Sequence, residues 1–347
     1  MGFPGKFQLE DMAFAAASPA IAWEKFRNAT VLVSGASGLI GSAIVNALLF
    51  ASERNGLDIR VVAWVRNAEK AAARLLPSPG LSIVQGPVET PPDVRGPVDY
   101  VVHAASPTQS LFFVRSPVET LQTAVMGMRA ALEFAKNAKC RGLAFLSTME
   151  VYGHPPKGLP VRENQPGAFD PSVVRNCYPL GKLLCESMGA AYASEYGVPA
   201  KSIRLTQTFG PGVERGDPRV FAEFARCVLD RKDIVLHSDG LTERCYLYVA
   251  DAVTAVLSVL TEGKPGESYT AANRSTYCSI RDMARMVATD IAGGAISVRL
   301  QPDAVDRGYA DTLYLDLDTS KLESLGWSPK TGLREMFSRM IGDMQCR

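Results

Sequence analysis

The sequence of 347 residues predicts an α/β protein: a doubly wound parallel Rossmann sheet with a smaller α/β substrate-binding lobe. Two observations carry this prediction. Strand-like and helix-like segments alternate over the first two-thirds of the chain, as they do in the βαβ units of a parallel sheet. The first of these units places a glycine-rich turn between its strand and its helix, and turns of this kind bind phosphate groups.

The expected elements follow one another in the order that a parallel sheet needs. Residues 30–34 are a short β-branched and apolar run, and apolar residues then recur at helical spacing between positions 40 and 49. Further strands are expected at residues 59–65, 98–103, 142–147 and 200–206. Helices are expected at residues 118–138 and 177–196, and the Gly-Val-Pro run at 197–199 ends the second helix.

The regular alternation stops after residue 210, and this change predicts the domain organisation. The later expected segments are helices at residues 218–229, 251–260, 279–291 and 333–341 and a strand at residues 234–237. We therefore expect a dinucleotide-binding Rossmann domain at residues 29–210 and a substrate-binding lobe at residues 211–347, with some segments returning to the first domain. Residues 1–28 are expected to be an N-terminal extension.

The bulk composition favours a cytoplasmic enzyme for a small molecule. The net charge is +1, which gives no general attraction to nucleic acid or to membrane surfaces. Seven cysteines without a Cys-x-x-Cys pair and only three histidines argue against a disulfide framework and a metal site. No apolar run has the length of a membrane span.

The glycine-rich turn has the spacing Gly-x-x-Gly-x-x-Gly, from Gly35 through Gly38 to Gly41. Gly35 permits the tight turn, Gly38 lets the backbone approach a pyrophosphate, and Gly41 allows the helix to pack closely on the strand. Amides at the start of the helix then face the phosphates. The residues expected to hold the cofactor here are Gly35, Ser37, Gly38, Leu39, Ile40 and Gly41.

Tyr178 and Lys182 form the Tyr-x-x-x-Lys pair of the chain. Residues four apart on a helix lie on one face, and a lysine ammonium beside a phenol favours the phenolate. A phenol titrates near ~10, so a base that works near ~7 needs a shift of roughly three units, or about 4 kcal/mol. We expect Lys182 and a nearby oxidised nicotinamide to supply this shift together.

Together, the glycine spacing and the Tyr178–Lys182 pair resemble the extended short-chain dehydrogenase/reductase superfamily. More narrowly, the chain resembles its nucleotide-sugar epimerases, dehydratases and decarboxylases over roughly residues 28–330. This resemblance implies NAD or NADP as the cofactor and a nucleotide-diphosphate sugar as the substrate. By analogy, the helices expected at residues 118–138 and 177–196 would form the interface of a homodimer.

The choice between NAD and NADP depends on the end of the second strand. Members of the superfamily that select NAD carry an acidic residue there, whereas this chain has Val65 followed by Arg66. A guanidinium can pair with a 2′-phosphate, so Arg66 favours NADP; a solvated Arg66 with NAD bound is the alternative. The resemblance also implies that Ala104 and Ala105 pass close to the cofactor.

The catalytic segment at residues 147–153 reads Ser-Thr-Met-Glu-Val-Tyr-Gly and resembles the Ser-Thr-x-Glu-Val-Tyr-Gly block of the family. The resemblance implies that Thr148 hydrogen-bonds the sugar oxygen at C4 and that Tyr178 takes its proton, with Lys182 assisting. Oxidation at C4 makes the C5 hydrogen acidic, and Glu150 would remove it.

Met149 departs from the family pattern, because dehydratases often have Asp or Ser there to protonate the departing C6 hydroxyl. Methionine has no proton to give. Glu150 argues against simple C4 epimerisation, and the run from Arg175 to Tyr178 resembles that of UDP-glucuronate decarboxylases. Dehydration and decarboxylation are therefore favoured, and a 4-epimerase remains an alternative.

Two further positions are expected to bind substrate beside Thr148 and Met149. Gln207 stands where the family usually has an Asn that contacts the sugar diphosphate, and Arg244 matches an arginine that grips a phosphate.

Two rival functions stay open from the sequence. An NADPH-dependent carbonyl reductase fits Arg66 but fits Glu150 and Arg244 less well. A non-enzymatic dinucleotide-sensing protein is disfavoured because Thr148, Tyr178 and Lys182 are all present.

Overall fold

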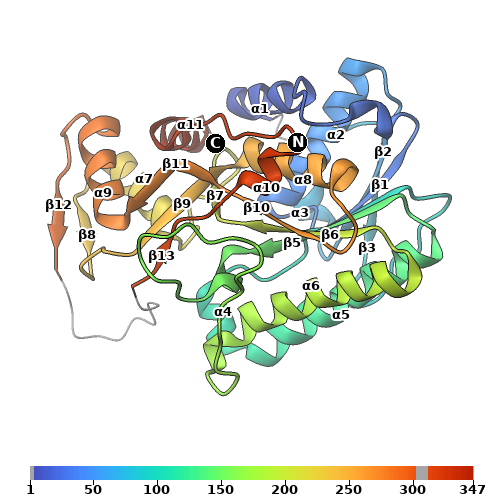
Figure 1. Ribbon diagram of the computed structural model, residues 1–347. Helices are drawn as coiled ribbons and strands as arrows, with labels where there is room; N and C mark the ends of the chain where they lie inside the picture. The colour runs from blue at the N-terminus through green and yellow to red at the C-terminus, as the bar shows by residue number, and fades with distance from the viewer. Residues whose placement is uncertain (1–3, 302–311, 347) are drawn as a thin grey trace.

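The computed structural model describes residues 4–301 and 312–346, and these residues contain the expected doubly wound sheet. Seven parallel strands lie in the order β10-β6-β5-β4-β1-β2-β3 (Figure 1). Their bounds are β1 (Thr30–Ser34), β2 (Arg60–Val65), β3 (Leu81–Gln85), β4 (Tyr100–His103), β5 (Gly142–Thr148), β6 (Ala200–Leu205) and β10 (Ser268–Ala271). The predicted fold class is confirmed.

Helices cover both faces of this sheet because successive strand residues point to opposite sides. Val31 and Val33 are fully buried on the face covered by α2 (Leu39–Asn55) and α8 (Val249–Glu262). Leu32 is equally buried on the other face, which α5 (Pro117–Asn137) and α6 (Cys177–Tyr196) cover. In Figure 1 these last two helices run side by side along one edge of the molecule. Among the described residues, no helix is both long and apolar enough to cross a membrane.

The second lobe is a smaller α/β unit with its own core. Its strands are β7 (Gln207–Phe209), β9 (Glu243–Tyr248), β11 (Asn273–Ser279) and β13 (Tyr314–Leu315), with β8 (Ile234–Leu236) paired separately to β12 (Val298–Leu300). Phe209 stacks on Phe221 with ring centroids 4.6 Å apart and meets Phe337 edge-on at 5.0 Å. Segments of the chain after residue 210 also serve the first sheet, because β10 pairs with β6 and α8 packs against it.

The remaining helices fall into short connecting turns and elements of the second lobe. They are α3 (Ala68–Ala72), α4 (Ser110–Arg115), α7 (Val220–Asp230), α9 (Ile280–Met286), α10 (Ser320–Glu323) and α11 (Leu333–Cys346), and a π-helical turn (Val287–Ile291) follows α9.

The N-terminal extension contains a helix, α1 (Lys6–Ala16), that the sequence did not predict. Its apolar residues do not gather on one face, so the helical pattern is weak. Tertiary contacts hold the helix instead: the Asp11 carboxylate accepts a hydrogen bond from the Tyr248 hydroxyl at 2.8 Å. The same carboxylate accepts another from Nη2 of Arg339 in α11 at 2.9 Å. Nδ2 of Asn55 in α2 donates a hydrogen bond to the Ala16 carbonyl at 3.1 Å, so the extension is tied to both lobes.

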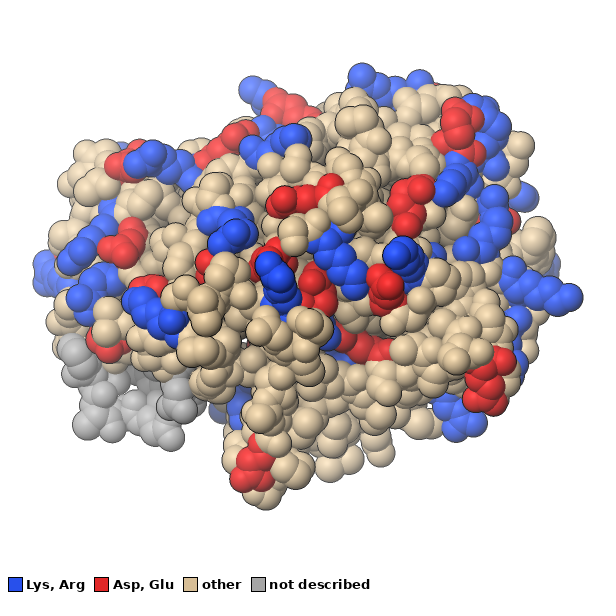
Figure 2. All heavy atoms as spheres, viewed as in Figure 1, with Lys and Arg blue, Asp and Glu red and all other residues tan. Residues whose placement is uncertain are grey.

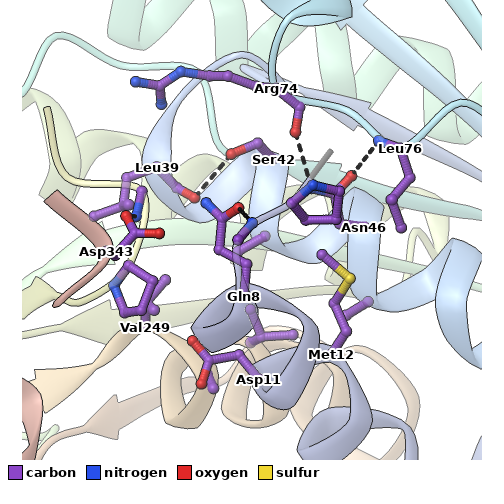
Figure 3. A pocket seen from close by; sticks show the side chains of 18 of the residues that line it. Gln8, Asp11, Met12, Leu39, Ser42, Asn46, Arg74, Leu76, Val249 and Asp343 are labelled. Carbon is purple, nitrogen blue, oxygen red and sulfur yellow. Dashed lines mark hydrogen bonds between the residues drawn. The ribbon is translucent and has the colours of Figure 1, made fainter. Parts of the chain in front are cut away.

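A cavity of about 220 Å³ lies between α1, α2 and α8 (Figure 3). Most of its walls are apolar, and the amide of Asn46 bonds the Arg74 carbonyl at 3.0 Å and the Leu76 amide at 2.9 Å. The Asp343 carboxylate accepts a hydrogen bond from the backbone amide of Gly212 at 2.9 Å. These bonds connect α2 and α11 to the loops that border the cavity.

A buried ion pair joins three adjacent strands to α6. Nη2 of Arg204 in β6 lies 2.7 Å from Oε2 of Glu186, and both side chains are more than nine-tenths buried. The hydroxyls of Ser147 in β5 and Ser268 in β10 donate to the same carboxylate at 2.5 and 2.9 Å. The pair therefore fixes the end of β5 that leads into the catalytic segment.

We expect Glu186→Gln to lower the free energy of unfolding by about 3–5 kcal/mol, because it leaves the Arg204 guanidinium buried without its counter-charge. The double variant Glu186→Leu/Arg204→Met should recover most of this loss, since it removes both charges. Urea unfolding of the three proteins measures the difference. A loss below about 1 kcal/mol in the single variant would contradict the assigned role of the pair.

Candidate active site

A cleft of about 330 Å³ opens at the carboxyl ends of the sheet strands and is bordered by both lobes. The structure brings most of the sequence-predicted site residues to its walls. They are Gly35, Ser37, Gly38, Leu39, Ile40, Gly41, Ala104, Thr148, Met149, Glu150, Tyr178, Lys182 and Gln207. Arg66, Ala105 and Arg244 do not line this cleft.

The glycine-rich turn has the close backbone approaches that its spacing predicts. Gly35 has a φ of 67°, and a Cβ there would lie 2.7 Å from the backbone of Ala105. A Cβ on Gly41 would lie 2.3 Å from the carbonyl oxygen of Gly35. The turn leads into α2 at Leu39, so the first amides of that helix face the cleft. These features fit the pyrophosphate of a dinucleotide.

Tyr178 and Lys182 lie in the first two turns of α6, and both are buried beside the cleft. The Nζ atom of Lys182 donates a hydrogen bond to the Leu146 carbonyl at 2.8 Å and lies 5.9 Å from the centre of the Tyr178 ring. Phe113 of α4 stacks on the phenol ring, with centroids 4.1 Å apart. The phenol of Tyr178 is therefore held between the Phe113 ring and the segment at residues 147–153.

Burial dominates the titration of both groups. It raises the pKa of Tyr178, and the charge of Glu150 adds to this, whereas a hydrogen bond with Thr148 acts in the opposite direction. Burial lowers the pKa of Lys182 to about 8, against the charges of Cys185 and Glu186. Lys182 is not among the main influences on the Tyr178 pKa in this structure. The expectation that Lys182 and an oxidised nicotinamide together lower the Tyr178 pKa stays a prediction for the complex with NAD.

Glu150 and Thr148 lie together where β5 ends in a short 3₁₀ turn (Met149–Tyr152). The Thr148 hydroxyl accepts a hydrogen bond from the Glu150 amide at 3.3 Å, which caps this turn. Nη2 of Arg175 donates to the Glu150 carboxylate at 2.9 Å, and the same guanidinium lies over the Phe113 ring. Arg175 therefore holds Glu150 beside Tyr178.

Met149 is buried between these two polar residues and is only 3% exposed. Its sulfur lies 3.1 Å from the Thr206 hydroxyl, but that hydroxyl is 2.5 Å from the Cys245 carbonyl. The single hydroxyl proton goes to the carbonyl, because a carbonyl oxygen is a much better acceptor than a thioether. Met149 therefore supplies no proton donor to the cleft.

Of the two further residues expected to contact the substrate, one lines the cleft and the other lies outside it. Gln207 of β7 lines the cleft. Arg244 of β9 lies outside it, and its buried Nε has no hydrogen-bond partner among the described residues. A buried guanidinium nitrogen without an acceptor is costly and is suited to an incoming anion.

Several cleft residues were not found from the sequence as site residues. They are Lys70, Arg74, Glu214, Asp217 and Arg219. The first two follow β2 and the others lie on the loop between β7 and α7, so no sequence spacing relates them. A charge-rich loop after the Gly-Pro-Gly run at residues 210–212 was the available signal.

The fold and the cleft together define a dinucleotide-binding α/β protein with a buried Tyr-x-x-x-Lys pair. The chain belongs to the NAD dependent epimerase/dehydratase family, whose sequence profile matches residues 31–272.

Curated relatives agree with this membership. The chain is 28% identical over 323 residues to UDP-glucuronic acid decarboxylase 3 of Arabidopsis thaliana, with 92% of this chain and 90% of the relative covered. It is 27% identical to UDP-glucuronic acid decarboxylase 1 of the same plant, with 91% of this chain and 70% of the relative covered.

Solved structures share the fold. The UDP-glucose 4-epimerase of Thermotoga maritima superposes with a TM-score of 0.76 at 23% identity and covers 91% of this chain and 99% of its own. The dTDP-glucose 4,6-dehydratase of Streptomyces venezuelae, solved with NAD bound, gives a TM-score of 0.76 at 23% identity. It covers 92% of this chain and 97% of its own.

Proposed function

We propose that this protein decarboxylates a nucleotide-diphosphate-linked uronic acid through a transient ketone at C4 of the sugar. The observation that carries the proposal is Met149, buried between Thr148 and Glu150. Dehydration needs a proton for the departing C6 hydroxyl, which methionine cannot give. Decarboxylation has no such leaving group. The curated relatives, named as UDP-glucuronic acid decarboxylases, support uridine and glucuronic acid as the substrate parts.

The chain's own residues have defined parts in this proposal. Bound NAD would accept the hydride from C4 and return it at the end of the cycle. Tyr178 takes the proton of the C4 hydroxyl, which Thr148 orients, and Lys182 together with bound oxidised NAD is expected to favour the phenolate. The ketone then receives the electron pair of the C5–C6 bond as carbon dioxide leaves, and C5 takes a proton. That proton comes from solvent water, and we assign Glu150 to relay it, since Arg175 holds its carboxylate beside Tyr178.

Incubation with UDP-, dTDP-, GDP- and CDP-linked sugars and with UDP-glucuronate tests the proposal by mass spectrometry. We expect UDP-glucuronate to lose carbon dioxide without net consumption of cofactor. Tyr178→Phe should slow turnover by about 10²–10⁴-fold while still binding NAD, because only the acid–base group is removed. Stoichiometric NADPH consumption would identify a reductase, and an unchanged mass with altered retention would identify an epimerase.

Glu150→Gln tests the assignment of the C5 proton. In D₂O the wild type should place one deuterium at C5 of the product, and the variant should turn over about 10²–10⁴-fold more slowly with NAD binding unchanged. Deuterium entry at the wild-type rate in this variant would remove Glu150 from the proposed role.

A 4,6-dehydratase is the second candidate, and Glu150 in the Ser-Thr-x-Glu segment is the observation that favours it. The same mass spectra separate the two, because a dehydratase removes water from a neutral nucleotide-linked hexose. In that case a group other than Met149 has to protonate the C6 hydroxyl. Asp217 also lines the cleft, but its carboxylate is paired with Arg219.

We also propose that the protein is a homodimer through α5 and α6. Apolar side chains are exposed along these helices, and Figure 2 shows few charges over this part of the face. The exposed residues are Val118, Leu121, Met126, Leu184 and Tyr196. Sedimentation should give a dimer for the wild type and a shift toward monomer for Leu184→Glu, because a charge is costly in an apolar interface. A monomeric wild type would end this proposal.

Arg66 is the residue that the sequence offers for a 2′-phosphate and hence for NADP. Its side chain is exposed and does not line the cleft, whereas Lys70 and Arg74 do. The finer choice between NAD and NADP therefore rests on the residues around Lys70 and Arg74.

A further inference from the structure

We propose that Glu214, from the second lobe, makes the cofactor site select NAD over NADP. The inference concerns dinucleotide binding alone, so it stands or falls separately from the proposed decarboxylation.

The usual device for selecting NAD is missing from the end of β2. That strand ends at Val65, and the next two residues are Arg66 and Asn67, so no carboxylate follows it directly. In Rossmann sheets this strand end faces the adenosine ribose, where an acidic side chain accepts a hydrogen bond from the 2′-hydroxyl. Another group has to take this part if NAD is to be preferred.

Two cations follow β2 and line the cleft beside the glycine-rich turn. Lys70 lies in α3 and Arg74 lies just after it, and both border the same cleft as Gly38 and Gly41. Left unpaired, an ammonium and a guanidinium at the ribose end of the site would attract a 2′-phosphate. Their position by itself would favour NADP.

Glu214 of the second lobe pairs with both cations. It lies on the loop between β7 and α7, and its Oε1 is 3.1 Å from Nζ of Lys70. Nη2 of Arg74 donates a hydrogen bond to the same oxygen. The hydrogen bond from Lys70 and the charge of Arg74 lower the pKa of Glu214, so it is ionised at neutral pH.

Other carboxylates at the cleft are engaged elsewhere. Glu150 pairs with Arg175 at 2.9 Å, and Asp217 pairs with Arg219 at 2.6 Å. Among the described carboxylates that line the cleft, Glu214 is therefore the one paired with the cations that follow β2.

The charge of Glu214 acts differently on the two cofactors. A 2′-hydroxyl can donate a hydrogen bond to this carboxylate, as it does to the acidic residue at the end of β2 in other sites. A 2′-phosphate carries close to two negative charges at neutral pH, so it would be repelled by the carboxylate or would have to displace it from both cations. Glu214 thus supplies, from the second lobe, the carboxylate that is missing at the end of β2.

Equilibrium binding of NAD⁺ and NADP⁺ to the full chain, measured by calorimetry without any sugar nucleotide, tests the proposal. The wild type should prefer NAD⁺. Glu214→Gln should shift the affinity ratio toward NADP⁺ by about tenfold or more, because it removes the like charge and frees Lys70 and Arg74. Glu214→Asp keeps the charge and should keep the preference for NAD⁺.

Two controls separate this effect from a general change in charge. Glu24→Gln removes a carboxylate that is paired with Arg27 at 2.9 Å outside the cleft, and it should leave the ratio unchanged. In the Glu214→Gln background, Lys70→Ala/Arg74→Ala should abolish the gain in NADP⁺ affinity. Any of three results overturns the proposal. The wild type could prefer NADP⁺, or the ratio of NAD⁺ to NADP⁺ affinity in Glu214→Gln could stay within about twofold of wild type. The third result is a gain in NADP⁺ affinity that persists when Lys70 and Arg74 are both replaced.

Discussion

The close approach of the backbone at Gly35 to the backbone at Ala105 is the constraint on which the site depends. It places the turn after β1 directly against the segment after β4, leaving no room for a side chain between them. α2 then starts with its amides at the carboxyl edge of the sheet. Because Thr148 ends β5 at the same edge, the glycine-rich turn and the segment at residues 147–153 open into one cleft. A side chain at position 35 would separate the two halves of that cleft.

The second lobe completes the cleft rather than merely covering it. It contributes Gln207 from β7, Arg219 before α7 and Glu214 between them. The lobes are joined by structural contacts as well, because α1 is bonded to Asn55 of α2 and, through Asp11, to Tyr248 and Arg339 of the second lobe. Residues that line the cleft therefore come from segments far apart in the chain. Beside them, the buried Glu186 carboxylate ties β5 and β6 to α6.

Local patterns predicted the parts whose geometry is set by neighbours in sequence. The bounds of α6 and β1 were expected as they are found, because apolar periodicity and glycine-proline punctuation mark them directly. α1 was missed because its sequence shows no apolar stripe, although tertiary contacts such as those of Asp11 hold the helix. The short strands of the second lobe, such as β9 and β11, were missed because they carry no long apolar run. Arg66 was chosen by its place in the sequence, yet its side chain lies outside the cleft.

The sequence by itself determined the doubly wound sheet, the glycine-rich turn and the Tyr178–Lys182 pair, since each depends on spacing within one βα unit or one helix. Only the tertiary structure decided which charges meet across the cleft. Arg175 reaches Glu150 across 25 residues, and Arg74 reaches Glu214 across 140. Such pairings follow from how the lobes pack, and an ion pair has no periodicity by which a linear pattern could reveal it.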